Sequence, residues 1–325
     1  MRPVKALTAA AVLSFALATP AFAAQCNPPA GFDAFLKEFR NEAAVKGLTP
    51  RTLSLLDTVT LDQSVLAADK RQGVFKLSFE EFATPRINQR WNRATKHMVE
   101  QAPTLRRVEK EFGVPGAMPI VLWGLETDFG THTGKHEVLR ATATLGFDCR
   151  RSEFFQNELF EALSLVQKGD LQPADLRGDW AGELGQAHFL PSSYNKFAID
   201  FDGNGKRDLI RSVPDTLASI ANYFKGYGWQ LRQPYGEGTA NFEVIRKWNK
   251  ALVYAKTWPR SPRSWKRARR EPSSRAVDVT PRLFAGQQEA FCHSSEQTFL
   301  RLHRLSSERR FSFEHDPEKW QPVFG

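Results

Sequence analysis

Apolar residues recur at helical spacing along most of the chain, and this pattern predicts a mainly helical fold. Residues 32–47 place apolar side chains on one helix face and end at a glycine, and these side chains are Phe32, Phe35, Leu36 and Phe39. The same pattern occurs in residues 49–59, 87–115, 152–170 and 213–229. Strict alternation of apolar and polar residues is rare, so strands should be few and short. We therefore expect a mainly helical α+β protein whose loops carry the chemistry.

The N-terminus has the pattern of a secretory signal peptide. Two basic residues precede an apolar stretch, which ends in the sequence Ala21-Phe22-Ala23. This order predicts removal of residues 1–23 and export of the remainder. A membrane anchor is the alternative, but the apolar run is short for a membrane span and Pro20 interrupts its end.

The cysteines bear on lipid attachment and on disulfide formation. Gln25 stands where a lipoprotein signal has a small residue, so a lipid anchor on Cys26 is not expected. Exported proteins meet oxidising conditions, which permit disulfides. The chain has three cysteines, so one must be left over. We expect a pair between Cys26 and Cys149 that ties down the N-terminus, with free thiols as the alternative.

The positive charge of the chain is concentrated near its C-terminal end. Lysine and arginine number 45 against 36 acidic residues, and residues 259–275 supply many of them. A net positive charge often indicates a polyanionic partner, but an exported protein is not expected to meet nucleic acid. Two explanations of the positive charge remain. The partner is a polyanionic cell envelope, or the charges form a run that is merely solvated.

The helical pattern also ends near this basic segment. Residues 241–257 still show apolar periodicity, but afterwards arginine, serine and proline crowd together. One explanation is a disordered basic tail. The other is a shifted reading frame, because GC-rich coding sequence read out of frame tends to give these residues. We therefore expect one folded domain over residues 27–257 and an atypical tail over residues 258–325.

A glutamate in apolar surroundings is the first candidate for chemistry. The sequence IVLWGLETDFGTHTG, residues 120–134, places Glu126 behind bulky apolar side chains with no basic residue in the segment. Such surroundings remove hydration from a carboxylate and disfavour its charged form. A carboxyl that keeps its proton near neutral pH can act as a general acid. The alternative is a helix end whose last polar residue points to water.

A glycine-rich loop is the second candidate. Residues 178–209 begin with closely spaced glycines, which let the backbone approach a bulky ligand, and continue with Trp180, Phe189 and Tyr194. Flat aromatic faces and side-chain amides suit sugar rings, whose apolar patches alternate with hydroxyl groups. A packed loop with core aromatics is the alternative.

Within this loop, residues 200–211 resemble a calcium-binding loop. Oxygen-bearing side chains occupy positions 1, 3, 5 and 9 of the pattern, namely Asp200, Asp202, Asn204 and Asp208. Gly205 is the turning glycine at position 6, and Lys206 stands at position 7, where the pattern uses a backbone carbonyl. Position 12 is Arg211, where a bidentate glutamate is expected, and Asp215 would have to supply the missing carboxylate. We expect a structural cation, with a water-filled turn as the alternative.

These stretches together resemble the membrane-bound lytic murein transglycosylase B family. The motifs that carry the resemblance run in the family order from about Phe32 to Thr257, and they are WGLETDFG, WAGELGQAHFLPSSYNKFAIDFDGNGKRDL, IANYFKGYGW and NFEVIRKWNKALVYA. The resemblance implies a periplasmic enzyme with a lysozyme-like helical domain and a small inserted β region that carries the cation loop. It also implies cleavage of the β-1,4 bond between N-acetylmuramic acid and N-acetylglucosamine in peptidoglycan.

The resemblance also implies roles for single residues. Glu126 matches the sole catalytic acid and base, in the context E-[TS]-x-[FWY]-G. Positions that contact the glycan match Arg150, Arg151, Phe154, Asp179, His188, Tyr223, Trp248, Asn249 and Tyr254. The family cation site matches Asp200, Asp202, Asn204 and Asp215, for Ca²⁺ or Na⁺. His188 stands where the family has a glutamine and Asp179 where some members have a serine, so these two contacts should differ here.

One carboxylate suffices for the implied reaction. Ordinary glycosidases use two, whereas in a lytic transglycosylase the N-acetyl oxygen of the substrate supports the reacting centre. The muramyl 6-hydroxyl then attacks, which gives a 1,6-anhydro product without water and without a cofactor. The alternatives are a hydrolytic muramidase, with Asp128 or Glu183 as second carboxylate, and a non-catalytic peptidoglycan-binding protein. We expect a monomer whose partners are glycan strands and cell-wall synthases or amidases.

Overall fold

The computed structural model describes residues 24–70 and 78–257, so the expected signal peptide and basic tail lie outside the described residues. Helices dominate the described part of the chain, which confirms the expected fold class. The helices are α1 (Gly31–Val45), α2 (Pro50–Leu53), α3 (Gln63–Lys70), α4 (Phe79–Glu100), α5 (Ala102–Phe112), α6 (Ala117–Thr127), α7 (Val138–Phe147), α8 (Ser152–Gln167), α9 (Pro191–Phe197), α10 (Val213–Gly226), α11 (Ala240–Trp248) and α12 (Leu252–Ala255). The strands are β1 (His136–Glu137) and β2 (Arg177–Gly178).

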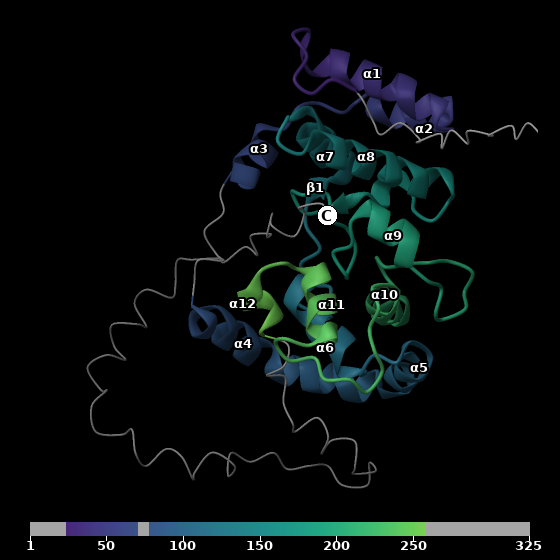
Figure 1. Ribbon diagram of the computed structural model, residues 1–325. Coiled ribbons are helices and arrows are strands. Elements are labelled where there is room, and N and C mark those ends of the chain that lie inside the picture. Colours follow the sequence, from purple (N-terminus) through teal and green to yellow (C-terminus); the bar gives the residue numbers. More distant parts are fainter. Residues whose placement is uncertain (1–23, 71–77, 258–325) are drawn as a thin grey trace, which may run out of the picture.

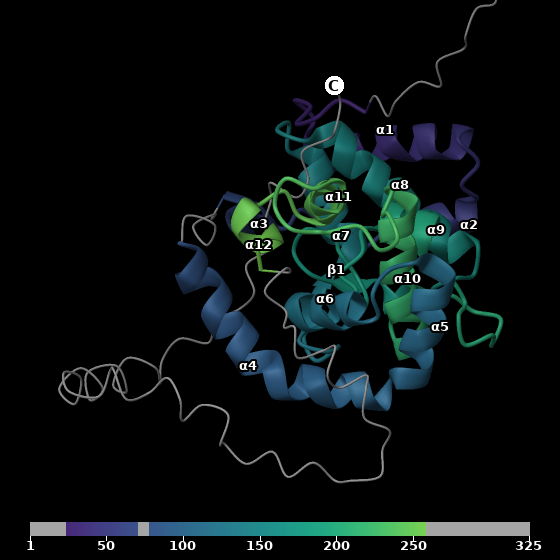
Figure 2. The same cartoon turned by 60° about the horizontal axis from the view of Figure 1, so that its bottom comes forward.

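The helices form two groups with the small sheet between them. Figure 1 shows α1, α2, α7 and α8 in the upper part, and α4, α5, α6, α11 and α12 in the lower part. Helix α10 contacts α5 and α6 on one side and α9 on the other, so it joins the two groups. Figure 2, turned by 60°, shows α4 running along the outside of the lower group, and α4 packs on α6.

Helix α6 forms the centre of the lower group. Nearly all of its side chains are buried, including Ile120, Leu122 and Trp123. A helix that is apolar on all sides is stable only when other elements surround it. Because the helix ends at Thr127, Glu126 is carried into this interior with the apolar residues that precede it.

Two segments that read as continuous in the sequence are each broken in the structure. Residues 87–115 belong to α4 and α5, which meet at Gln101 because Pro103 starts a new helix and lacks the N–H that would continue the old one. Helix α4 also begins earlier than the pattern indicated, at a capping box between Ser78 and Glu81. Residues 241–257 divide into α11 and α12 around Asn249, whose backbone is extended.

The small sheet holds the glycine-rich loop in place. Strands β1 and β2 are antiparallel, with His136 opposite Gly178, and a further bridge joins Gly178 to Leu184. A Cβ atom on Gly178 would lie 1.8 Å from the carbonyl oxygen of Glu183, and one on Gly134 would lie 2.0 Å from the carbonyl group of Gly178. Only glycine fits at these two close approaches.

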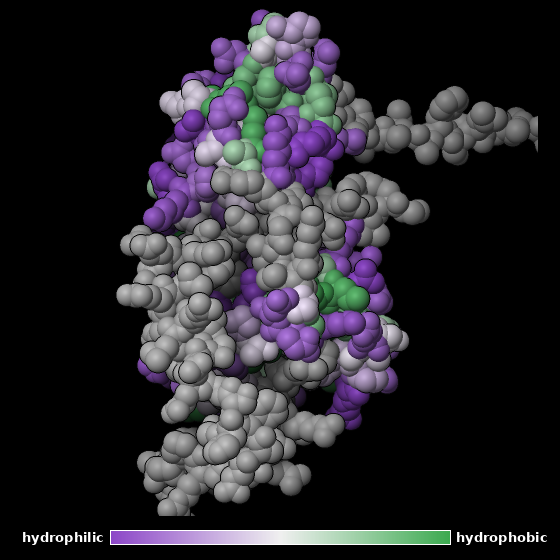
Figure 3. Space-filling view, turned by 90° about the vertical axis from the view of Figure 1, so that its left-hand side faces the viewer, coloured by the Kyte–Doolittle hydropathy of each residue, from purple (hydrophilic) through white to green (hydrophobic). Residues whose placement is uncertain are grey.

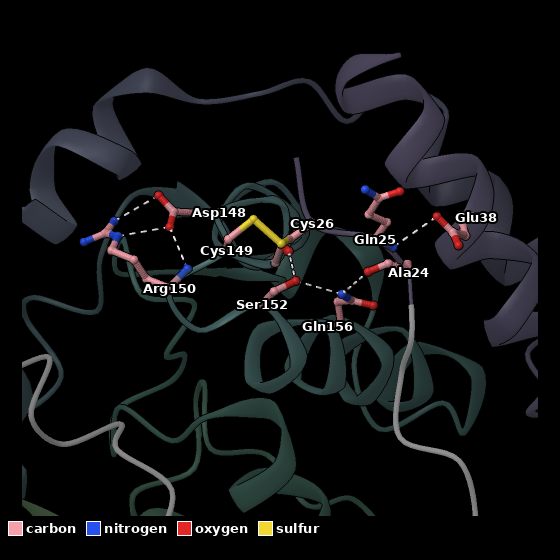
Figure 4. Close-up of a disulfide and its surroundings, with 10 residues drawn as sticks. Ala24, Gln25, Cys26, Glu38, Asp148, Cys149, Arg150, Ser152 and Gln156 are labelled. Atoms are coloured by element: carbon pink, nitrogen blue, oxygen red, sulfur yellow. Dashed lines mark hydrogen bonds and ion pairs between the residues drawn. A yellow bond between two sulfur atoms is a disulfide. The ribbon is translucent and has the colours of Figure 1, made fainter. Parts of the chain in front are cut away.

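A disulfide joins Cys26 to Cys149 and attaches the N-terminal segment to the loop between α7 and α8 (Figure 4). Their Cα atoms lie 5.1 Å apart. The side-chain amide of Gln156 donates to the carbonyl oxygen of Ala24 at 2.8 Å on the same segment. Cys292 lies outside the described residues.

Figure 3 shows the side of the molecule that carries α3 and α4. Hydrophilic residues predominate over its described part, and the larger group of hydrophobic residues lies at the end that carries α1. Among residues 24–70 and 78–257, none of the helices combines the length and the hydropathy that crossing a membrane requires.

Candidate active site

Glu126 is buried, and two side chains from the C-terminal helices bind its carboxylate. Only 7% of Glu126 is exposed. The indole Nε1 of Trp248 donates to Oε1 at 2.7 Å, and the hydroxyl of Tyr254 donates to the same oxygen at 2.5 Å. Trp248 ends α11 and Tyr254 lies in α12, so the break between these helices aims both donors at the end of α6.

The tyrosine donor is held in its protonated form. Burial, together with the neighbouring Glu126, raises the pKa of the Tyr254 hydroxyl well above its usual value. A hydroxyl that does not ionise in the working pH range remains a hydrogen-bond donor. Oε1 of Glu126 therefore keeps two donors, and Oε2 is the oxygen that faces His188.

His188 lies beside Glu126 on a strained backbone. Its Nδ1 is 3.9 Å from Oε2 of Glu126, and the residue is buried. The φ angle of His188 is +47°, which is uncommon for a residue with a side chain. Residues with a side chain in this conformation are found in turns and, more often than elsewhere, at functional sites. His188 therefore lies next to the carboxylate of Glu126. Its expected contact with the glycan remains a prediction.

Asp179 has a different environment. Its Oδ1 accepts hydrogen bonds from the backbone N–H groups of Ala181 at 3.0 Å and Glu183 at 2.9 Å. These bonds fold the loop back on itself, in the manner of an Asx turn. The contacts described for Asp179 thus stabilise the loop that carries His188.

The two carboxyl groups considered as second catalytic acids are placed very differently. Asp128 follows α6 with a φ angle of +53° and pairs with Arg93 and with Arg90, whose Nε lies 3.3 Å from Oδ1. Glu183 is completely buried and interacts electrostatically with the hydroxyls of Tyr223 and Tyr254. Asp128 therefore forms ion pairs with arginine side chains. Glu183, in contrast, is buried near Tyr223 and Tyr254.

Aromatic rings pack around the donors of Glu126. The ring of Tyr223 lies 4.8 Å from that of Trp248, and Phe189 lies 5.4 Å from Trp248, as centroid distances. The Tyr223 hydroxyl donates to the carbonyl oxygen of Lys247 at 2.7 Å, and burial raises its pKa well above its usual value. These contacts fix the indole of Trp248 from two sides.

Asn249 also lies in this region but is engaged locally. It is buried, and its Oδ1 accepts a hydrogen bond of 2.9 Å from the N–H of Ala251. This bond orients the turn into α12, and thereby Tyr254. The expected contact of Asn249 with the glycan remains a prediction.

The basic residues expected beside the glycan gather around Asp69 of α3. Asp69 is buried and pairs with Arg151 and with Arg150, the latter at 2.5 Å. Phe154 packs on the hydrophobic cluster that contains Val65 of α3 and Trp180. The contacts described for these three residues therefore attach α3 to the loop after the disulfide and to the start of α8. Their contact with substrate remains a prediction.

Gln186 was not singled out in the sequence, although it positions the end of α6. Its Oε1 accepts from Trp123 at 3.0 Å, and its Nε2 donates to the carbonyl oxygen of Ile210 at 3.1 Å. Its backbone carbonyl accepts from the hydroxyl of Thr127 at 2.7 Å. A glutamine within a loop gives no sequence signal for such a role.

The expected cation loop brings three carboxylates together. Asp200, Asp202 and Asp215 each offer an oxygen atom, and these atoms lie within 4.8 Å of one another. Asp215 is buried, which raises its pKa, although its carboxylate accepts three backbone N–H bonds. The remaining expected ligand, Asn204, is exposed, and its Oδ1 accepts from the N–H of Lys206 at 2.9 Å. Hard oxygen donors are the ligand type that Ca²⁺ prefers.

Arg211 explains how the loop departs from the usual pattern. Its guanidinium pairs with Asp175 and, at 3.5 Å, with Asp208. The side chain at position 12, Arg211, thus pairs with carboxylates outside the candidate cation site. Asp215, at the start of α10, contributes the carboxylate that clusters with those of Asp200 and Asp202.

Known proteins share this sequence and fold. The profile of the family described as the transglycosylase SLT domain matches residues 31–240. Membrane-bound lytic murein transglycosylase B of Escherichia coli is 35% identical over 182 residues, which cover 54% of this chain and 48% of that protein. The chain therefore spans about half the length of this curated relative.

Solved structures of lytic transglycosylases are also similar to this chain. SltB3 from Pseudomonas aeruginosa in complex with NAG-anhNAM-pentapeptide has 34% identity and a TM-score of 0.60, with 63% of this chain and 55% of that chain covered. The Escherichia coli lytic transglycosylase Slt35 in complex with calcium has 26% identity and a TM-score of 0.60, with 69% and 90% covered. The expected lysozyme-like fold is confirmed by these matches, and the chain belongs to the transglycosylase SLT domain family.

Proposed function

We propose that the protein is a lytic murein transglycosylase that cleaves the bond between N-acetylmuramic acid and N-acetylglucosamine in peptidoglycan strands. The observation that carries the proposal is the environment of Glu126, a buried carboxylate bound at one oxygen by Trp248 and Tyr254. The family membership and a relative in complex with NAG-anhNAM-pentapeptide support the substrate class.

Glu126 acts first as an acid and then as a base in this proposal. Its proton passes to the glycosidic oxygen as the bond from C1 to that oxygen breaks, and the N-acetyl oxygen of the substrate supports the positive charge at C1. The 6-hydroxyl of the same sugar then attacks C1 and returns its proton to Glu126, which closes the 1,6-anhydro ring. The two donors on Oε1 stabilise the carboxylate between these steps.

A hydrolytic muramidase needs a second carboxylate to activate water. Asp128 is paired with Arg90 and Arg93, which disfavours it as a base or nucleophile, and Glu183 is completely buried, so it has no exposed oxygen with which to activate water. A transglycosylase requires no such group, so the arrangement favours the non-hydrolytic reaction. Membership of the transglycosylase SLT domain family favours an enzyme over a non-catalytic binding protein.

We further propose that residues 27–257 form the catalytic domain and that the protein works in the periplasm after loss of residues 1–23. The pattern of the N-terminus supports export. The acidic loop is proposed to bind Ca²⁺ through Asp200, Asp202, Asn204 and Asp215, because their oxygen atoms suit that ion and a relative was solved with calcium.

Lysis of purified sacculi by Glu126→Gln and by the unaltered protein tests the proposal. The glutamine keeps the size of the side chain but cannot give and accept the proton, so lysis should fall at least about 1,000-fold while the thermal unfolding temperature stays close to that of the unaltered protein. Glu137→Gln, which changes an exposed glutamate, is the control. Substantial lysis by Glu126→Gln would refute the assignment.

A further inference from the structure

The N-terminal segment of the described chain is built into the fold. Ala24 is buried and belongs to the main hydrophobic cluster, although residues near the end of a domain are commonly exposed. Cys26 forms the disulfide with Cys149. The N–H of Asn27 donates to the carbonyl oxygen of Phe147 at 3.0 Å. The chain is therefore anchored directly after the expected cleavage site.

A buried amide in α8 holds this segment and has one atom left over. Gln156 is only 1% exposed, and Figure 4 shows its amide beside Ala24. Its Nε2 donates to the carbonyl oxygen of Ala24 at 2.8 Å and to the hydroxyl of Ser152 at 2.8 Å, so both of its N–H bonds are used. Its Oε1 has no hydrogen-bond partner among the described residues. A buried acceptor without a partner is unfavourable and rare in folded proteins, so this oxygen is suited to a donor that the described chain does not supply.

The expected removal of the signal peptide creates such a donor. Hydrolysis of the peptide bond between Ala23 and Ala24 consumes water, and it leaves a carboxylate on the removed peptide and an α-amino group on Ala24. This amino group is mostly protonated at pH 7, because its usual pKa is about 7.7–8. An ammonium group donates more hydrogen bonds than the peptide nitrogen that it replaces. The new group is separated by only the Cα and carbonyl carbon atoms of Ala24 from the oxygen that Gln156 already binds.

The charges around this point favour a cation. Oε2 of Glu38 in α1 accepts a hydrogen bond of 3.1 Å from the N–H of Gln25, the residue that follows Ala24. Glu38 is exposed, so water weakens its attraction, and the hydrogen bond to Gln156 has to fix the position of the ammonium. Asp148 and Arg150 lie across the disulfide in Figure 4 and pair with each other at 3.0 Å, so their charges largely cancel.

We propose that the α-ammonium group of Ala24, which forms when residues 1–23 are removed, docks on Oε1 of Gln156 and completes the anchor of the N-terminal segment. The disulfide attaches the same segment to the loop that leads into α8, where Arg150 and Arg151 lie. Removal of the signal peptide therefore stabilises the loop that carries two of the expected glycan contacts. The inference rests on the proposed export of the protein and not on the proposed reaction.

Two proteins that differ only in their chain ends test the docking. One starts at Ala24, and the other carries Gly-Ser in front of Ala24, so that its ammonium group lies away from Gln156. In urea, the protein that starts at Ala24 should have an unfolding equilibrium constant at least about tenfold lower, because it gains a hydrogen bond from a charged donor to a buried acceptor. Equal constants for the two proteins would overturn the inference.

Variants of the acceptor test the role of Gln156. Gln156→Met keeps the length of the side chain and removes the acceptor, so the ratio between the two chain ends should fall below about threefold. Gln167→Met is the matched control, because Gln167 ends the same helix but binds Thr49 and Gly47. This control should destabilise both proteins and keep their ratio. A ratio that Gln156→Met leaves unchanged, or that Glu38→Gln removes, would overturn the assignment of the docking site to Gln156.

Amine labelling covers the case in which Gln156→Met does not fold. At pH 7 an amine-reactive ester should label the α-amino group of Ala24 at least about tenfold more slowly than that of the extended protein, because a docked group reacts only after local opening. Equal labelling rates would refute the docking, and so would an exported protein whose first residue is not Ala24. These measurements use no murein, so their failure is distinguishable from a failure of the proposed lysis.

Discussion

Tyr254 donates a hydrogen bond of 2.5 Å to the carboxylate of Glu126, across 128 positions of sequence. The bond joins α12, at the end of the described chain, to α6 at the centre of the lower helix group. The acid and its donor therefore come together only when the whole domain has folded. This relationship makes the last helices of the described chain part of the candidate active site.

Replacing Tyr254 by phenylalanine should lower the rate of lysis without unfolding the protein. The change removes one hydrogen bond to a charged carboxylate, and such a bond contributes about 1.5–3 kcal/mol, or roughly 10- to 150-fold in rate if it acts only in the transition state. Tyr235→Phe is the control, because Tyr235 packs on Trp229 and not on Glu126. Equal rates for the two variants would show that the Tyr254 hydroxyl does not contribute to catalysis.

Stability should decline as the pH rises through neutrality because of Glu158 in α8. Burial raises the pKa of Glu158 to about 7 from 4.5, against the opposing effect of the hydrogen bonds from Ser192. A group that holds its proton more tightly in the folded state contributes stability below its unfolded pKa, and this contribution is lost as the pH rises through the folded value.

Urea unfolding of Glu158→Gln measures this contribution. Between pH 4.5 and pH 8 the unaltered protein should lose up to about 3 kcal/mol relative to the variant, since one pKa unit corresponds to about 1.4 kcal/mol. Glu243→Gln, at an exposed ion pair on α11, is the control and should not alter the trend. Parallel pH curves for Glu158→Gln and the unaltered protein would contradict the predicted role of Glu158.

Calcium should raise the thermal unfolding temperature if the acidic loop binds it. An ion that binds only the folded state at a hundredfold excess over its dissociation constant stabilises by about 2.7 kcal/mol. Asp200→Asn removes one of the three clustered carboxylate charges and should abolish most of the response, whereas Asp33→Asn in α1 should retain it. Identical unfolding temperatures in calcium and in chelator would argue against a cation site.

The helical fold and the apolar surroundings of Glu126 could be predicted from local patterns because both depend on short-range sequence. Apolar residues throughout α6 require a buried helix, and Glu126 follows from its place at the end of that helix. Proline and glycine signals marked several helix ends, although the boundary at Gln101 was missed because the apolar stripe continues across it.

The partners of the site residues depend on contacts between distant segments, which local patterns do not record. Only the family resemblance pointed to Trp248 and Tyr254, whose donors reach Glu126 from more than 100 residues away. The pairing of Asp69 with Arg150 and Arg151 gave no sequence signal, because each residue reads as an exposed charge. The burial of Glu183 was equally hidden, since a glutamate between glycines normally faces solvent.

The most direct test of the account is the chemical identity of the ends that the purified protein leaves on murein strands. Sacculi digested with the protein are analysed by mass spectrometry, beside sacculi treated with Glu126→Gln. The account predicts 1,6-anhydromuramic acid ends from the unaltered protein and none above background from the variant. Reducing muramic acid ends in place of anhydro ends would show that water is the nucleophile, and would contradict the account.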